Sequence, residues 1–225
     1  MKTWCIPPQQ DAEFVCCLED VLMTYALPYD PRYPTVCMDE ASKQLIGEVA
    51  LPLPVRPGQP RCEDYEYERH GTSNQFVFCE PLRGWRHVTV TDRRTRKDWA
   101  DAIRELVDVH YPHAQKIRLV MDNLNTHSGA SLYERFPPDE ARRILNKLEF
   151  HYTPKHASWL NMAEIEIGVM NRQCLNRRLD NAEYLRREVA AWEERRNAQQ
   201  AKIHWTFTIA TARVKLKKLY PSIED

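Results

Sequence analysis

The sequence lacks the features that mark several specialised classes of protein. Only 6 of its 225 residues are glycine, 43% are hydrophobic and 28% are charged, which excludes collagenous, low-complexity and disordered chains. No run approaches the roughly 20 apolar residues that cross a bilayer. The first residues have no apolar signal-peptide core and carry Pro7, Pro8 and Asp11 where that core would lie. We therefore expect a globular cytoplasmic protein with no membrane partner.

Neither cysteine usage nor net charge points to a particular partner. The number of cysteines, 7, is odd and no two form a Cys-x-x-Cys pair, which argues against a disulfide framework and a zinc ribbon. Most are expected to be buried, reduced thiols. Lys plus Arg and Asp plus Glu number 32 each, but the basic residues are in excess after residue 112. The second half is thus the side that we expect to face a polyanion, although a solvated helical surface explains the asymmetry equally well.

Hydrophobic periodicity predicts a single α/β unit. A meander of strands followed by β-α-β crossovers implies one mixed sheet with helices on its faces. Residues 56–67, rich in Pro and Gly, are expected to form a loop. The predicted helices are 11–26, 98–110, 131–136, 138–148, 158–178, 181–199 and 208–220, and the predicted strands are 35–42, 43–54, 75–82, 85–92, 116–123 and 149–154.

Two of the predicted strands end in an acidic residue, Asp39 and Asp122. Ligands of α/β sheets bind at the carboxyl ends of strands, so both carboxylates are expected at one crevice. Glu164 and Glu166 lie on a following helix, about 200° apart around its axis, so only one of them can join the site. The other is expected to be exposed to solvent.

Three converging carboxylates repel one another unless cations lie between them. Oxygen ligands suit Mg²⁺ or Mn²⁺, and two such ions about 4 Å apart can hold the attacking and leaving oxygens of a phosphodiester. The pattern therefore indicates phosphoryl transfer on DNA or RNA. The alternative is structural, because an Asp after a strand is commonly a turn former or helix cap and a helical Glu is commonly solvated.

The segments around these acids resemble those of one family. CMDEASKQL, LVMDNLNTH and TPKHASWLNMAEIEIGVMNRQCLNRR are similar to motifs of DDE transposases from bacterial insertion sequences of the mariner superfamily, the IS-six-thirty branch. DYEYERHGTSN, PLRGWRHVTVTDRRT, DWADAIRELVDVHYP, SLYERF and ARVKLKKLYP extend the resemblance in the same order. It covers nearly the whole chain.

The resemblance implies an RNase H-like mixed sheet flanked by helices, with Asp39, Asp122 and Glu164 as a catalytic triad that binds two Mg²⁺ or Mn²⁺ ions. Glu164 is preferred to Glu166 because Asn-Met-Ala-Glu takes the place of the family's Asn-Pro-x-Glu. The 42 positions between Asp122 and Glu164 exceed the usual spacing, which implies an insertion around residues 138–148.

The same resemblance supplies neighbours for the triad. Lys155 and His156 are expected to contact phosphate. Trp159 either stacks on a base or, as we prefer, packs in the core. Ser158 is a candidate N-cap of the helix that carries Glu164. The residues implied to bind DNA or support the site are Asn123, His127, Lys155, His156, Trp159 and Asn161.

The implied activity is cut-and-paste DNA transposition. Water attacks the phosphodiester at a transposon end, and the freed 3′-hydroxyl then attacks target DNA, usually at a TA dinucleotide. The partners implied are double-stranded DNA at transposon ends and target, and a second copy of the chain. The expected division is an N-terminal helix and connector over 1–33, a catalytic domain over 34–180 and a C-terminal helical extension over 181–225.

The sequence departs from the family at its start, where a helix-turn-helix region that recognises transposon ends is expected. Its absence implies either a split reading frame, with a separately encoded helix-turn-helix half, or a truncated remnant. Two further hypotheses therefore stand beside the active enzyme. One is a silent remnant that binds full-length transposase, and the other is an RNase H-like nuclease that cleaves without joining ends.

Overall fold

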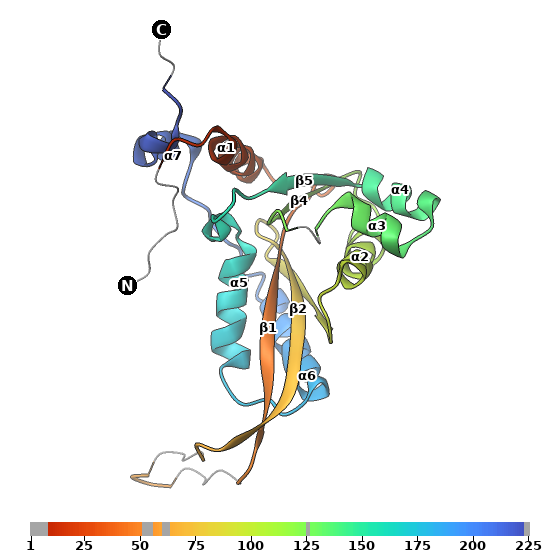
Figure 1. Ribbon diagram of the computed structural model, residues 1–225, viewed down its shortest axis with the longest axis vertical. Helices are drawn as coiled ribbons and strands as arrows, with labels where there is room; N and C mark the ends of the chain where they lie inside the picture. Colours follow the sequence, from red (N-terminus) through yellow and green to blue (C-terminus); the bar gives the residue numbers. More distant parts are fainter. Residues whose placement is uncertain (1–8, 51–55, 60–63, 125–126, 223–225) are drawn as a thin grey trace.

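The computed structural model describes residues 9–50, 56–59, 64–124 and 127–222. Its centre is one five-stranded mixed sheet in the order β3-β2-β1-β4-β5 (Figure 1). β1 pairs antiparallel with β2 and parallel with β4, so the sheet changes direction at β1. The strands are β1 Thr35–Glu48, β2 Tyr67–Glu80, β3 Trp85–Thr91, β4 Ile117–Met121 and β5 Leu148–Tyr152.

Helices cover both faces of this sheet, as the sequence predicted. α2, α3 and α4 pack on one face, whereas α5 and α6 run beside the hairpin of β1 and β2 on the other (Figure 1). No described helix is both long and apolar enough to cross a membrane. The helices are α1 Ala12–Ala26, α2 Arg96–Glu105, α3 Gly129–Arg135, α4 Pro138–Asn146, α5 Ala163–Met170, α6 Ala182–Ala198 and α7 Ile209–Lys215.

The alternation of side chains along the strands divides the core into layers. Met38 and Phe78 are buried against Trp99 of α2, whereas Val77 is buried against Trp192 of α6 on the opposite face. A third cluster joins α1 to the C-terminal segment, where Leu18 packs near Leu219. The two ends of the described chain are thus part of the folded unit.

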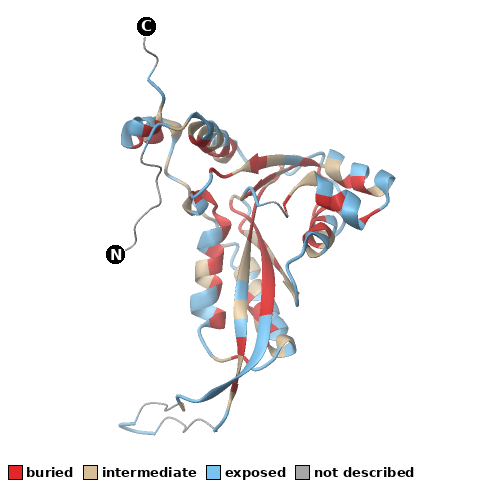
Figure 2. Cartoon of the chain, in the orientation of Figure 1, coloured by how far each residue is buried: buried red, intermediate tan, exposed pale blue. Residues whose placement is uncertain are grey.

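The hairpin of β1 and β2 continues beyond the three strands around it and forms a projecting arm (Figure 2). β3 pairs with β2 only as far as Asn74, so the arm beyond this point has two strands. A β-bulge between Gln44 and Ile46 marks its base, and Gly71 at the bulge has a φ of 93°, a conformation that favours glycine. The backbone of Leu179 accepts a hydrogen bond from Ile46 N, which ties the arm to the segment after α5.

The outer edge of β3 is covered by side chains of α6. Asn197 accepts a hydrogen bond from Arg86 N and donates one to Arg86 O, each 2.8 Å long. Glu193 accepts another from Val88 N at 2.9 Å. These side chains satisfy backbone groups that an edge strand otherwise exposes.

Several boundaries differ from those predicted. Segments 35–42 and 43–54 were predicted as two strands but form one strand to Glu48, and residues 51–54 lie outside the described part. The predicted helix 158–178 is interrupted, because a 3₁₀ turn at Ser158–Leu160 precedes α5 and a π-helical turn at Asn171–Leu175 follows it. Periodicity alone does not detect such changes of helical pitch.

The cysteines are free in the described part of the chain, as predicted. Cys37, Cys79 and Cys174 are buried, whereas Cys16 is exposed and Cys17 is half-buried. Cys5 and Cys62 lie outside the described residues.

Candidate active site

Parallel pairing of β1 with β4 places Asp39 and Asp122 side by side where β4 ends. We call this position of Asp39 and Asp122 the acidic edge. Cys37 lies opposite Val120 in the parallel register, and each carboxylate follows two residues later on its own strand. Asp39 is still within β1, whereas Asp122 is the first residue after β4. The structure therefore confirms that Asp39 and Asp122 lie on neighbouring parallel strands. The prediction that a strand ends at Asp39 was wrong, because β1 continues to Glu48 in its pairing with β2.

Asp39 is buried and held by two contacts. Its Oδ1 accepts a hydrogen bond from Glu40 N at 2.8 Å, and its Oδ2 accepts one from Asn161 Nδ2 at 3.2 Å. Burial, together with the negative charges of Glu164 and Asp122, raises the pKa of Asp39 to about 7 against the opposing effects of the Glu40 hydrogen bond and the charge of His127. The side chain of Asp39 therefore lies in a field of negative charge that favours protonation or a bound cation.

Asn161 orders the segment that connects the sheet to α5. Its side chain donates to Met38 O at 2.8 Å as well as to Asp39, and its Oδ1 accepts from Ala163 N at 3.1 Å. The last contact makes Asn161 the side chain that binds the start of α5. Ser158, predicted as the N-cap, lies instead in the preceding 3₁₀ turn and makes no capping hydrogen bond.

Glu164 and Glu166 occupy opposite environments on α5, as their spacing predicted. Glu164 lies in the first turn and is exposed, on the side from which its charge acts on Asp39. Glu166, expected to be exposed, is wholly buried. Its Oε1 accepts from Arg86 at 2.9 Å and from Arg196 at 2.8 Å. The expectation was wrong because it considered α5 alone, whereas β3 and α6 supply the two guanidinium groups.

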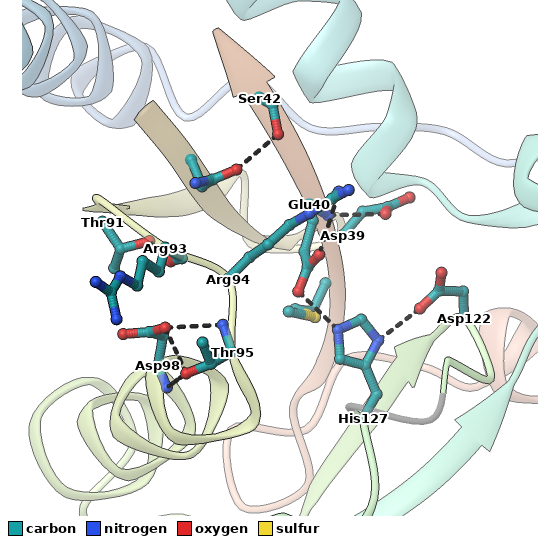
Figure 3. A network of polar contacts seen from close by, with 12 residues as sticks. Asp39, Glu40, Ser42, Thr91, Arg93, Arg94, Thr95, Asp98, Asp122 and His127 are labelled. Carbon is teal, nitrogen blue, oxygen red and sulfur yellow. Dashed lines mark hydrogen bonds and ion pairs between the residues drawn. The ribbon is translucent and has the colours of Figure 1, made fainter. Parts of the chain in front are cut away.

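His127 connects the acidic edge to the opposite face of the sheet (Figure 3). Its Nδ1 lies 2.6 Å from Asp122 Oδ1, and its Nε2 lies 2.9 Å from Glu40 Oε1. Burial lowers the pKa of His127, but the hydrogen bonds with Asp122 and Glu40 outweigh burial and raise it to about 9. A protonated imidazole can donate to both carboxylates at once, so His127 fixes one oxygen of Asp122.

Glu40 is the residue that sequence reasoning missed. It follows Asp39 directly, so the alternation of a strand turns it to the other face, where it meets His127 and, at 3.8 Å, Arg94. The ring of His127 also stacks on Trp99, with 5.9 Å between ring centroids. The sequence does show Asp39 and Glu40 as adjacent acids in CMDEASKQL. Because Glu40 faces away from Asp39, however, the sequence gave no reason to pair Glu40 with His127.

Three of the remaining predicted residues line a hollow beside Asp122, whereas Trp159 lies outside it. This hollow of about 570 Å³ is lined by Asn123, Lys155 and His156 together with residues of α1. His156 has a φ of 65°, an uncommon backbone conformation for a residue with a side chain. Trp159 is half-buried and meets Phe207 edge-on at 5.8 Å between centroids, which favours its predicted packing role over base stacking.

The chemistry of Asp39, Asp122 and Glu164 suits a hard divalent cation. All three offer carboxylate oxygens, and the pKa of Asp39 is raised first by burial and then by the negative charges of Glu164 and Asp122, which a cation would offset. In the described part of the chain these three side chains do not form a group whose ligand atoms all lie within 4.8 Å of one another. The oxygens must therefore move closer to share one ion.

Comparison with known families assigns the chain to a superfamily. Residues 34–186 match the family described as DDE superfamily endonuclease. The chain belongs to the DDE superfamily of endonucleases. None of the curated proteins compared with the chain matches it significantly.

Solved structures of Mos1 mariner transposase share the fold of this DDE superfamily member. A paired-end complex with the left transposon end aligns with a TM-score of 0.56 and 13% identity, over 89% of this chain and 63% of that chain. A strand transfer complex aligns with a TM-score of 0.56 and 14% identity, over 89% of this chain and 62% of that chain. A paired-end complex with Mg aligns with a TM-score of 0.56 and 14% identity, over 99% of this chain and 67% of that chain. The chain thus spans less than two thirds of the length of the first of these transposases. The expected RNase H-like architecture is confirmed.

Proposed function

We propose that this DDE superfamily member is the catalytic part of a DNA transposase that cuts and joins DNA at transposon ends. The observation that carries the proposal is the position of Asp39 in β1 next to Asp122 at the end of the adjacent parallel strand β4, where Asp39 also experiences the charge of Glu164. The fold shared with Mos1 transposase complexes supports it. The affiliation with a bacterial insertion-sequence branch of this superfamily is part of the proposal.

Within the proposal, Asp39, Asp122 and Glu164 are the catalytic residues and hold two Mg²⁺ or Mn²⁺ ions. Such ions, when bound, lower the pKa of water and stabilise negative charge on the attacking and leaving oxygens of a phosphodiester. A paired-end complex of Mos1 with Mg and another with Mn support this choice of cation.

The protein's own groups around the triad orient its oxygens. His127 holds Asp122 Oδ1, which leaves the second oxygen of Asp122 for a cation, and Asn161 fixes Asp39. Lys155 and His156 lie on the exposed wall of the adjacent hollow, where a DNA phosphate can approach them. Asn123 lies beside Asp122 on the same wall.

The proposed substrate is double-stranded DNA, first the transposon end and then the target, bound by a homodimer. Recognition of the ends by a separately encoded helix-turn-helix half belongs to the same proposal. In it, residues 34–180 act as the catalytic domain, with 1–33 as an N-terminal connector and 181–225 as a helical extension.

Nicking of supercoiled plasmid that carries the element's ends tests the proposal. Wild type should cleave in the presence of Mg²⁺ or Mn²⁺, and Asp122→Asn, which keeps a hydrogen-bond acceptor for His127, should lower the rate at least 1000-fold because a charged ligand is lost. Asp139→Asn is the matched control, since Asp139 is exposed in the first turn of α4. It should cleave like wild type.

Three other results would contradict the proposal in different ways. Equal cleavage by Asp122→Asn and wild type would exclude the assigned triad. Cleavage without any joined product would indicate a nuclease. No cleavage, even after a helix-turn-helix half is added, would indicate a silent remnant.

A further inference from the structure

A group of potential metal ligands lies away from the acidic triad, at the outer edge of the sheet. His87 comes from β3, Glu105 ends α2 and His110 ends the π-helical turn Leu106–His110. One ligand atom from each lies within 4.8 Å of the other two, which no other three His, Cys, Asp or Glu side chains in the described ranges achieve. His87 Nε2 is 3.6 Å from Glu105 Oε1, and the two imidazole rings are 4.2 Å apart at their centroids.

The π-helical turn is what places Glu105 and His110 together. Residues five apart in an α-helix point about 140° away from each other. The wider turn, in which Tyr111 N donates to Leu106 O at 3.0 Å across five residues, brings them onto one side. Single π turns inside helices occur frequently at functional sites.

We propose that His87, Glu105 and His110 bind a transition-metal ion of the zinc class. Two imidazoles and one carboxylate form a nitrogen-rich ligand set that suits Zn²⁺, and a water molecule completes the tetrahedron. Ligand atoms around tetrahedral zinc are about 3.4 Å apart, close to the 3.6 Å between His87 and Glu105. Small side-chain movements therefore suffice to close the site.

The surroundings of the three ligands fit a metal site as well. Glu193 Oε1 lies 3.0 Å from His87 Nδ1, so a carboxylate orients this ring. His87 Nε2 faces Glu105 and lies 3.3 Å from Thr89 Oγ1, a hydroxyl that a bound ion would displace from this nitrogen. His110 Nε2 is buried and has no hydrogen-bond partner among the described residues. Trp85 packs 5.0 Å from His110 on the inner side, while a hollow of about 390 Å³ beside His87 and Glu105 leads to solvent.

This zinc-class site is separate from the acidic triad in position and in chemistry. His87 lies opposite Phe78 and Met38 across the sheet, whereas Asp39 lies opposite Val77. Directly paired residues share a face and neighbouring residues alternate, so His87 and Asp39 project from opposite faces. A bound ion would join edge strand β3 to the end of α2, and Glu193 extends the connection to α6.

Calorimetric titration with Zn²⁺ in an excess of Mg²⁺ tests this proposal, because Mg²⁺ occupies the oxygen-only triad. Wild type should bind one Zn²⁺ per chain, with a rise in melting temperature. Glu105→Gln and His110→Gln should each weaken binding at least tenfold and remove most of that rise. His113→Gln, which changes an exposed histidine three residues further on, should behave like wild type.

Two results would overturn the zinc-class site. One is Zn²⁺ affinity that is the same in wild type, Glu105→Gln and His110→Gln, and the other is an equal loss in His113→Gln. Circular dichroism without zinc checks that each variant is folded. Co²⁺ provides a second readout, because a tetrahedral site should give visible absorption bands that are lost in both ligand variants.

Discussion

His127 is the cationic side chain shared by Glu40 of β1 and Asp122, which follows β4. It is the side chain that contacts both Glu40 and Asp122, and its own ring is completely buried. Breaking a buried ion pair from one side is costly because the remaining charge stays buried without a partner. His127 therefore both stabilises the fold, by pairing with the buried Glu40, and orients the side chain of Asp122.

His127→Ala should lower the free energy of unfolding by about 2–4 kcal/mol, because Glu40 loses its buried partner. Urea denaturation followed by circular dichroism measures this change. Cleavage should fall as well, since Asp122 loses the contact that orients it. The exposed His113 provides the control, and a His127→Ala variant as stable as His113→Ala would contradict the assignment.

At the residue scale, Asp39 and Asp122 were predictable from the sequence pattern, and the family resemblance implied His127 and Asn161 as supporting residues, whereas Glu40 was not predicted. Asp39 and Asp122 follow apolar strands, a local pattern that is visible in the sequence. The contacts of Glu40 with His127 join positions 87 apart and depend on which strands are neighbours. Nothing local in the sequence encodes that adjacency.

Among the secondary-structure elements, α5 is fixed by a buried charge cluster. Glu166 binds Arg86 of β3 and Arg196 of α6, so one carboxylate joins three elements. Glu164 lies two residues earlier on the same helix, on the side from which its charge acts on Asp39. The position of Glu164 therefore depends on the anchoring of Glu166.

The two glutamates of α5 should separate stability from activity. Glu166→Gln should lower the free energy of unfolding by roughly 3–5 kcal/mol, because Arg86 remains buried without its counterion. Glu164→Gln should change stability by less than about 0.5 kcal/mol, since exposed substitutions are usually mild, yet abolish cleavage. Denaturant titration and plasmid nicking of both variants measure the two effects, and equal stability of the pair would contradict the buried cluster.

Prediction of elements succeeded where one physical pattern dominated. The apolar run of β4 and the capped helix α6, whose N-cap Asn181 accepts from Tyr184 N, were located within a few residues. The 3₁₀ and π turns around α5 were not, because a local change of helical pitch leaves little trace in the apolar periodicity of the sequence. β1 was divided in two because its polar middle, Ser42 to Gln44, interrupts the apolar pattern where the arm leaves the core.

On the scale of the whole molecule, cation binding should be coupled to folding. A ligand that binds only the folded state stabilises it by about 2.7 kcal/mol at 100 times its dissociation constant. Mg²⁺ should therefore raise the melting temperature of wild type, measured by differential scanning calorimetry, and chelation should reverse the effect. Asp122→Asn should lose the increase and Asp139→Asn should keep it, whereas an equal increase in both would place the cation elsewhere.

The bulge at the base of the arm limits how far a change of length can spread. A slip of one residue between two strands turns every following side chain to the other face. Pairing beyond Ile46 already follows a different register from pairing before Gln44, so the bulge can absorb an insertion at the tip. A change of length in the arm can thus leave the pairing around Asp39 intact, whereas a deletion between Asp39 and Gln44 turns the side chains between the deletion and the bulge to the other face.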